Sequence, residues 1–431
     1  MDGKDHVFLY VRVSDRTYNI IRKRIDMEIL DQFTEQLHEW SLSGKEPLLA
    51  SNDLRYFLDQ QEKRLKDSGT IREEEFSHVE EEIKGSLDRK ENGYSSRILY
   101  REAMQNITYH KDGKQVRKIR RPVTLYVSFT DRDGHEDREY TCPNCGNSMS
   151  AMQARDGCPF CGTYFETDDI YPCVSSYYTV PGIVERAGLM DRIKKEMLIT
   201  GLIIGTIAFF LYMFSWTDIP VLFRIPLALL AAAFGGGMAA IMWYFLRSIF
   251  LLIRVIKEAG RSMPLLKTLR SRRKMLDFMK AYDPEFSYEA FEGRVISLLR
   301  AIIFSDDRDR LSIYESDRDL SDFDDIVDMQ SRGTIYIRKC EKINGLLSVE
   351  GDAYLTDTYI RNSLKEKDEK IRFILQKEID AHADPGFSIH RVLCPSCGGS
   401  FDALHRRNCP YCGNPYDLKK KDWIVADMMK V

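Results

Sequence analysis

The sequence predicts an α+β fold in two halves, each with helices first and an antiparallel sheet after them, joined by a hairpin of two apolar helices. Three observations support this prediction. In each half, apolar residues recur at helical spacing before they begin to alternate with polar residues. An almost uncharged stretch runs from Met197 to Leu246, and one cysteine pattern occurs on each side of it. The length of 431 residues allows roughly two to four domains.

The N-terminal module, residues 1–141, begins with predicted helices. One apolar face runs through a helix over Arg16–Trp40. Ser51 or Asp53 is a start signal for the next helix. A capping-box pattern then predicts a third, acidic helix over Thr70–Leu87.

Strand patterns follow these helices. Asp112-Gly113 is a turn signal within Ile107–Ile119, and apolar and polar residues alternate over Val123–Phe129. These runs predict an antiparallel sheet that ends just before the first cysteines.

The C-terminal half repeats this order. Start signals and an apolar face predict a helix over Tyr288–Phe304. The run Asp306–Asp325 is rich in acidic residues but lacks the glycine and the spacing of a calcium-binding loop. We therefore predict a solvated linker there rather than a calcium site. The strand-like runs that follow are Ile326–Met329, Thr334–Ile343, Leu346–Leu355 and Lys370–Glu378.

Eight of the ten cysteines form two copies of one pattern. Each copy has two Cys-Pro-x-Cys-Gly knuckles about a dozen residues apart, which is the spacing of a closed, tetrahedral zinc site with four thiolates. The first set of predicted ligands is Cys142, Cys145, Cys158 and Cys161, and the second is Cys394, Cys397, Cys409 and Cys412. We therefore predict two structural zinc ions, in ribbons over 142–173 and 394–420.

Disulfide bonds in a secreted protein are the alternative interpretation of these cysteines. The chain is long, is not rich in cysteine, and shows no signal peptide at its start, so this interpretation is disfavoured. The likeness of the two ribbons also indicates an internal duplication of helix, sheet and ribbon.

Two apolar segments predict a transmembrane hairpin over 190–256. The segments 197–216 and 225–246 carry no charge and are each long enough to cross a bilayer as a helix. A buried helical hairpin in a soluble core is the alternative. Three cations precede the first segment and nine follow the second, which places both termini in the cytoplasm of a multi-pass plasma-membrane protein.

The C-terminal half resembles a known family at Asp283, Pro284, Phe286 and Phe291, which precede and begin the amphipathic helix. These residues are similar to those of the C-terminal domain of the mitochondrial import-motor anchor, subunit forty-four of the inner-membrane translocase, and its bacterial relatives. The resemblance covers roughly a quarter of the chain. It implies that residues 275–393 form a cone of the nuclear-transport-factor-2 type, which binds proteins, peptides or lipids and is not an enzyme.

The chain departs from the mitochondrial protein in its two spans and two ribbons, and we see no targeting peptide at its start. We therefore expect a bacterial-type membrane protein and do not transfer the import-motor role. Whether residues 1–141 form a second cone remains open.

Three functions follow as hypotheses. The first is a membrane-anchored binding or scaffold protein, without enzyme activity, that engages a protein, peptide or lipid partner during translocation or membrane-protein assembly. The second is contact of the ribbons with RNA or the ribosome, with Arg406 and Arg407 in the second ribbon; the net charge of -3 disfavours general nucleic-acid binding. The third is an unrecognised enzyme with a pocket in the cone, although no P-loop or hydrolase motif is present.

A few single residues carry weaker hypotheses. His405 lies inside the second ribbon and is an alternative ligand, although four cysteines already complete that site. Cys340 is expected to be a small buried apolar residue, and neither it nor Cys173 is expected to be reactive. The basic run Ser248–Lys274 either binds anionic lipid headgroups or only sets the orientation of the spans.

Overall fold

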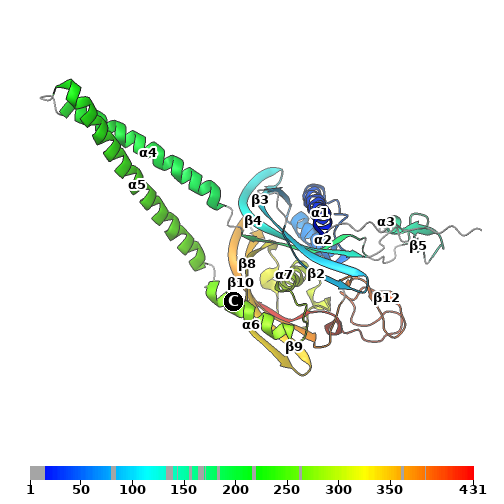
Figure 1. The fold of residues 1–431 in the computed structure, drawn as a ribbon. Helices are drawn as coiled ribbons and strands as arrows, with labels where there is room; N and C mark the ends of the chain where they lie inside the picture. The colour runs from blue at the N-terminus through cyan, green and yellow to red at the C-terminus, as the bar shows by residue number, and fades with distance from the viewer. Residues whose placement is uncertain are drawn as a thin grey trace, which may run out of the picture. The chain divides into compact units, whose positions relative to one another are not determined.

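The computed structural model describes most of the chain, in two compact units. The described residues are 15–78, 84–132, 139–142, 144–154, 158–163, 169, 171–181, 185–215, 220–261, 265–360, 364–383 and 385–431. One unit combines Met1–Gly182 with Arg270–Val431, and the other is Ile183–Leu269 (Figure 1). The chain therefore leaves the first unit for the second and returns to it.

The N-terminal half of the first unit contains two long helices and a five-stranded antiparallel sheet. These elements are α1 (Asp15–Ser43), α2 (Asn52–Asp67), β1 (Thr70–His78), β2 (Lys84–Glu91), β3 (Tyr94–Lys111), β4 (Lys114–Arg132) and β7 (Cys173–Pro181). Helix α2 begins where the sequence predicts, because the Ser51 side chain accepts a hydrogen bond from the backbone N–H of Leu54.

The C-terminal half has the corresponding elements around a four-stranded antiparallel sheet. These are α6 (Leu265–Lys280), α7 (Tyr288–Phe304), the short 3₁₀ turns η1 (Arg308–Arg310) and η2 (Ser321–Phe323), β8 (Ile326–Ile343), β9 (Leu346–Ile360), β10 (Leu364–Glu378) and β13 (Ile424–Lys430). Helix α7 has the predicted bounds, and the Ser287 side chain caps it by accepting a hydrogen bond from the N–H of Ala290.

Both sheets have the same strand order. The first runs β1-β3-β4-β7 and the second runs β8-β9-β10-β13. In each sheet, one set of four cysteines lies in the connection between the third strand of that order and the last. Two helices also precede the first strand in both halves. This shared topology supports a duplication of one helix-sheet-ribbon unit.

The two halves share one hydrophobic core. Most buried apolar residues of α2, α7 and both sheets belong to one cluster of contacting side chains. Helices α2 and α7 pack against each other, and β7 of the first sheet lies beside β8 of the second. Phe57 of α2 and Phe304 of α7 are in ring contact, with centroids 5.8 Å apart. The halves are therefore parts of one folded body rather than separate modules on a linker.

The predicted acidic helix from Thr70 is wrong. Residues Thr70–His78 form β1, which pairs along its whole length with β3. Arg72, Glu74 and Phe76 of β1 are buried and alternate with more exposed residues. Because two of these buried residues are charged, the sequence lacks the alternation of apolar and polar residues that would predict a strand. Pairing with a long strand overrides the local capping-box pattern.

The predicted solvated linker is also wrong for its apolar residues. Leu311, Ile313, Leu320 and Phe323 are buried in the shared core between η1 and η2. Burial of these side chains outweighs the acidic composition of the segment, so the segment is fixed against the sheet.

The second unit consists of two long apolar helices. Helices α4 (Glu185–Ser215) and α5 (Val221–Arg261) contain the candidate membrane spans Ile193–Ser215 and Val221–Phe250. The predicted spans fall within these helices, except for Trp216, which lies outside the described residues.

Glycines let these two helices approach closely. A Cβ added to Gly236 of α5 would lie 2.6 Å from the carbonyl oxygen of Gly201 on α4. Added to Gly205, it would lie 3.0 Å from the carbonyl oxygen of Ala232. Close contact at small residues is typical of helix pairs in lipid.

Candidate metal centres

The structure brings together both sets of cysteines that the spacing predicts. Within each set, the four Sγ atoms lie within 4.8 Å of one another. The Sγ atoms of Cys142 and Cys161 are 3.6 Å apart, and those of Cys394 and Cys412 are also 3.6 Å apart. Four thiolates around a tetrahedral zinc ion at about 2.3 Å would have Sγ–Sγ distances of about 3.8 Å. Both clusters therefore fit a four-coordinate metal site.

One backbone turn is used in all four knuckles. In each turn, the N–H of the glycine after the second cysteine donates to the carbonyl of the first cysteine. These glycines have φ angles of 69–73°, in the left-handed region. They are Gly146, Gly162, Gly398 and Gly413. The sequence pattern Cys-Pro-x-Cys-Gly thus encodes the turn that aims two sulfurs at one point.

Backbone N–H groups of the knuckles also stabilise thiolates. Hydrogen bonds from the N–H groups of Cys397 and Ser396 lower the pKa of Cys394 to about 6. The backbone amides of Cys145 and Asn144 likewise lower the pKa of Cys142. A metal cation binds the thiolate form, so these amides favour metal binding at neutral pH.

The two ribbons differ in how they join the rest of the fold. Cys394 and Cys409 belong to the shared core of the first unit. Cys142 and Cys158 instead form a small cluster of their own with Met149, and strands β5 (Glu139–Thr141) and β6 (Ser148–Ser150) pair beside it. The second ribbon is therefore built into the core, whereas the first has a separate packing centre.

Each ribbon carries an exposed aromatic residue in its second knuckle. Phe160 is 64% exposed, and Tyr411 at the same position of the second ribbon is 70% exposed. The ring of Tyr411 lies against Gly399, where an added Cβ would be 2.5 Å from its Cδ2 atom. The first ribbon has Asn147 at the position of Gly399, so only Tyr411 has this support.

His405 is not part of the second set of metal ligands. Its Nδ1 lies 3.0 Å from a carboxylate oxygen of Asp402, and its Nε2 lies 3.2 Å from the hydroxyl of Tyr56 on α2. It therefore links the second ribbon to the N-terminal half. Burial raises the pKa of the Cys173 thiol and raises that of Cys340 to about 12, which disfavours a reactive thiolate at either position.

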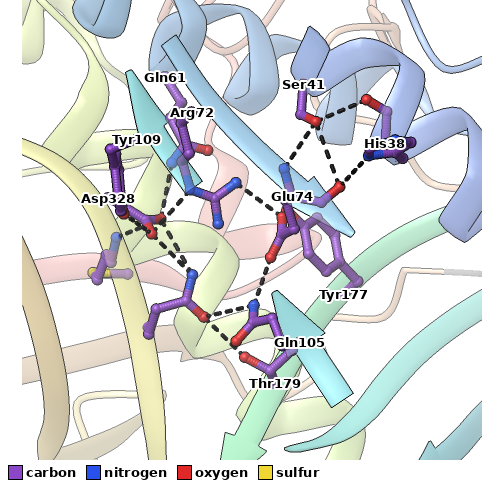
Figure 2. Close-up of polar contacts among 12 residues, drawn as sticks. His38, Ser41, Gln61, Arg72, Glu74, Gln105, Tyr109, Tyr177, Thr179 and Asp328 are labelled. Carbon is purple, nitrogen blue, oxygen red and sulfur yellow. Dashed lines mark hydrogen bonds and ion pairs between the residues drawn. The ribbon is translucent and has the colours of Figure 1, made fainter. Parts of the chain in front are cut away.

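Sequence reasoning missed a buried polar seam between the two sheets, most of which Figure 2 shows in close-up. We define this polar seam as Gln61, Arg72, Glu74, Gln105, Tyr109, Thr179, Arg300, Asp328 and Gln330. Arg72 lies 2.9 Å from Glu74 and 3.0 Å from Asp328, which pairs a strand of the first sheet with one of the second. The Tyr109 hydroxyl donates to the same Asp328 carboxylate.

Electrostatics in the polar seam favours the charged form of Asp328. Burial by itself raises the pKa of Asp328, but Arg72 and hydrogen bonds from Gln330 and Tyr109 outweigh it and lower that pKa. Arg300 of α7 donates to the carbonyl of Tyr177 on β7 and to that of Met329 on β8. Side chains thus join the neighbouring edges of the two sheets.

A cavity of about 460 Å³ opens near this boundary, between α2 and the η1–η2 segment. Two of its lining residues, Arg64 and Arg308, donate to backbone carbonyls, such as those of Ile326 and Leu320. Burial, followed by the neighbouring Arg308, lowers the pKa of Arg64 to about 10. The two guanidinium groups therefore stabilise the fold of this segment.

Comparison of the chain with protein-family models, with curated proteins and with solved structures found no match. The resemblance to the import-motor anchor therefore depends on the sequence motif at Asp283–Phe291 alone.

Proposed function

We propose that this protein is a membrane-anchored binding or scaffold protein, without enzyme activity, in the plasma membrane. Its apolar hairpin is the anchor, and both termini lie in the cytoplasm. Its folded unit engages a protein or peptide partner at the inner face, in translocation or membrane-protein assembly. Residues 275–393 serve as a partner-binding cone of the nuclear-transport-factor-2 type.

The shared core is the observation that carries this proposal. Chain segments before and after the hairpin pack into one unit, as the buried contacts of α2 with α7 demonstrate. Two segments that share a core lie on one side of a bilayer, and a chain that crosses twice returns to the side it left. The positively charged residues that flank the two spans favour the cytoplasmic side for both chain segments, in agreement with their location on one side of the membrane.

Zinc is the metal that we propose for both clusters. Four cysteine thiolates without an open position are typical of structural zinc, which adds folding free energy and no chemistry. Elemental analysis of the purified protein is expected to give two zinc ions per chain. Removal of Cys394 by substitution with Ser is expected to leave one.

Photo-crosslinking in intact membranes tests the binding role. A photoreactive amino acid at Phe160 or Tyr411 would probe the exposed ribbon tips, and one at Leu42, which is 52% exposed on α1, is a matched control. We expect distinct protein adducts at a tip position, identified by mass spectrometry, that the control does not form. Adducts with lipid or with the protein itself alone would contradict a partner-binding role.

Contact with RNA through the second ribbon is a second candidate function. The supported ring of Tyr411 is a stacking platform for an unpaired base. Arg406, Lys420 and Lys421 are exposed nearby in the chain and form no ion pair with another described residue. Salt-dependent RNA binding that Tyr411→Ala abolishes and Tyr411→Phe retains would favour this function. Phe160→Ala in the first ribbon is the control.

A further inference from the structure

The hairpin of β3 and β4 ends in a strongly basic arm. We define the basic arm as residues 106–121, the part of the hairpin around the Asp112-Gly113 turn. It carries six cations and one carboxylate, Asp112. The cations are Lys111, Lys114, Arg117, Lys118, Arg120 and Arg121.

The arm is fixed on one face and open on the other. Ile107 and Tyr109 of its inner face are fully buried, and the Tyr109 hydroxyl is held by Asp328 at 2.9 Å. On the outer face, the side chains of Lys118 and Arg120 are exposed. The cations are therefore presented by a rigid strand.

Among the described residues, only one of these six cations has an ion-pair partner. Arg117 pairs with Glu366 at 2.5 Å, and Arg121 donates to Gln105. Lys111, Lys114, Lys118 and Arg120 form no ion pair with another described residue. The carboxylates that share the outer face are those of Glu73 and Glu75 on β1, on the far side of β3, and Glu73 lies 3.7 Å from His110.

Two exposed aliphatic side chains lie among these cations. Val116, near the tip of the arm, is 50% exposed, and Ile71, opposite His110 on the neighbouring β1, is 54% exposed. Cations mixed with exposed aliphatic residues are typical of protein surfaces that lie at the boundary between lipid headgroups and acyl chains.

The arm extends beyond the last residue of β7, the strand beside it in the sheet. Strand β7 pairs with β4 from Thr130 to Val123, and its last residue, Pro181, lies opposite Val123. The segment Lys114–Pro122 of β4 thus lies beyond the end of β7, and among the described residues only β3 pairs with it. Helix α4 begins at Glu185, shortly after Pro181, and leads into the first apolar span.

We propose that the basic arm binds the phosphate headgroups of anionic phospholipids and so holds the folded unit against the membrane surface. This proposal rests on the membrane anchoring proposed above. An anionic leaflet attracts each nearby cation, and the attraction falls off within a Debye length. Because the arm is rigid and its anchor is in the same membrane, little conformational freedom is lost on binding.

Hydrogen–deuterium exchange of the full chain in lipid nanodiscs tests the proposal. The backbone N–H groups of Lys114–Arg121 that point away from β3 have no strand partner, so they exchange rapidly unless another surface covers them. We expect exchange in this segment to be at least about tenfold slower in discs with anionic lipid than in neutral discs. The difference should disappear at high salt.

A charge-reversal variant provides a second, independent test. Lys114→Glu combined with Lys118→Glu and Arg120→Glu should remove the lipid-dependent protection. The matched control, Lys420→Glu with Lys421→Glu on the second ribbon, should retain it. Unchanged zinc content and an unchanged circular dichroism spectrum would establish that the variants are folded. The salt dependence of exchange in the wild type tests the proposal without any variant.

Equal exchange in anionic and neutral discs would overturn the proposal. The lysines would then serve only to prevent edge-to-edge pairing of the open strand, which needs no lipid. Protection in neutral discs that required added single-stranded RNA would also overturn it. Failure to enter discs at all would instead contradict the membrane anchoring on which the proposed function depends.

Discussion

Arg72 is the residue on which the junction of the two sheets depends most directly. Its guanidinium bridges Glu74 on its own strand and Asp328 on β8, and all three side chains are almost fully buried. Burial alone lowers the pKa of Arg72, but Asp328 and Glu74 reverse this effect and raise it. Loss of the Arg72 guanidinium would leave two buried carboxylates without the cation that they share, which is strongly unfavourable.

Substitution of Arg72 tests this dependence. Arg72→Met is expected to destabilise the protein by about 3–5 kcal/mol, because it leaves Glu74 and Asp328 buried without their cation. Lys45→Met, which breaks the solvent-exposed pair with Glu39, should have a much smaller effect. Thermal unfolding in detergent, followed by circular dichroism, measures both. Equal effects of the two substitutions would contradict the assigned role.

The buried Asp357 carboxyl should make the free energy of unfolding depend on pH. Burial, and then the neighbouring Glu369 carboxylate, raise the pKa of Asp357 well above its ordinary value. Above about pH 4, an aspartate in the unfolded chain loses its proton, whereas Asp357 in the folded protein keeps it. The folded state then binds more protons, so the free energy of unfolding falls as the pH rises through this window.

Asp357→Asn should remove this fall in the free energy of unfolding as the pH rises. The amide can donate to Glu369 at every pH, so the variant should be more stable than the wild type at pH 8, by at least about 1 kcal/mol, with little difference near pH 4. Thermal unfolding at both pH values measures the effect, with the exposed Asp380→Asn as control. A variant less stable than the wild type at pH 8 would contradict the raised pKa.

Among the elements, those with local signals were predictable from the sequence. Helices α2 and α7 have a serine cap and an apolar face, and Asn344-Gly345, a local turn signal, separates β8 from β9. Strand β7 was missed because it is stabilised by pairing with β4, after a long intervening ribbon. Such pairing leaves no trace in the local sequence pattern.

The hairpin in the second unit depends on Gly236. Gly236→Ala would place a methyl group 2.6 Å from the Gly201 carbonyl oxygen and should destabilise the helix pair by about 1–3 kcal/mol. Gly237→Ala is the matched control, because a Cβ there meets nothing within 4 Å. Unfolding in a graded series of detergents measures both variants. A Gly237 variant as unstable as the Gly236 variant would contradict this helix interface.

For the whole molecule, the sequence predicted the two cysteine sets and the two apolar helices, because each depends on residues close together in the chain. It did not predict that both halves share one core. The polar seam joins residues such as Arg72 and Asp328, which are far apart in the sequence. Their individual positions in strands carry no signal that they are partners.

The two ribbons should respond differently to loss of a ligand. Cys394→Ser is expected to lower the unfolding temperature of the whole first unit, because Cys394 lies in the shared core and structural zinc contributes about 10 kcal/mol or more to the folding of a ribbon. Cys142→Ser should release one zinc ion with little change in the main unfolding transition, since its cluster is separate. Zinc content and calorimetry measure both effects, and identical unfolding of the two variants would contradict the difference.

The most direct test of the whole account is the membrane topology of the full chain. Epitope tags at either terminus and at position 218, between the two spans, would be tested for protease access in sealed vesicles of both orientations. We expect the two terminal tags to be cleaved only in inside-out vesicles and the central tag only in right-side-out vesicles. Terminal tags on opposite sides of the membrane, or release of the protein by alkaline carbonate, would contradict an anchored protein whose two halves share one cytoplasmic core.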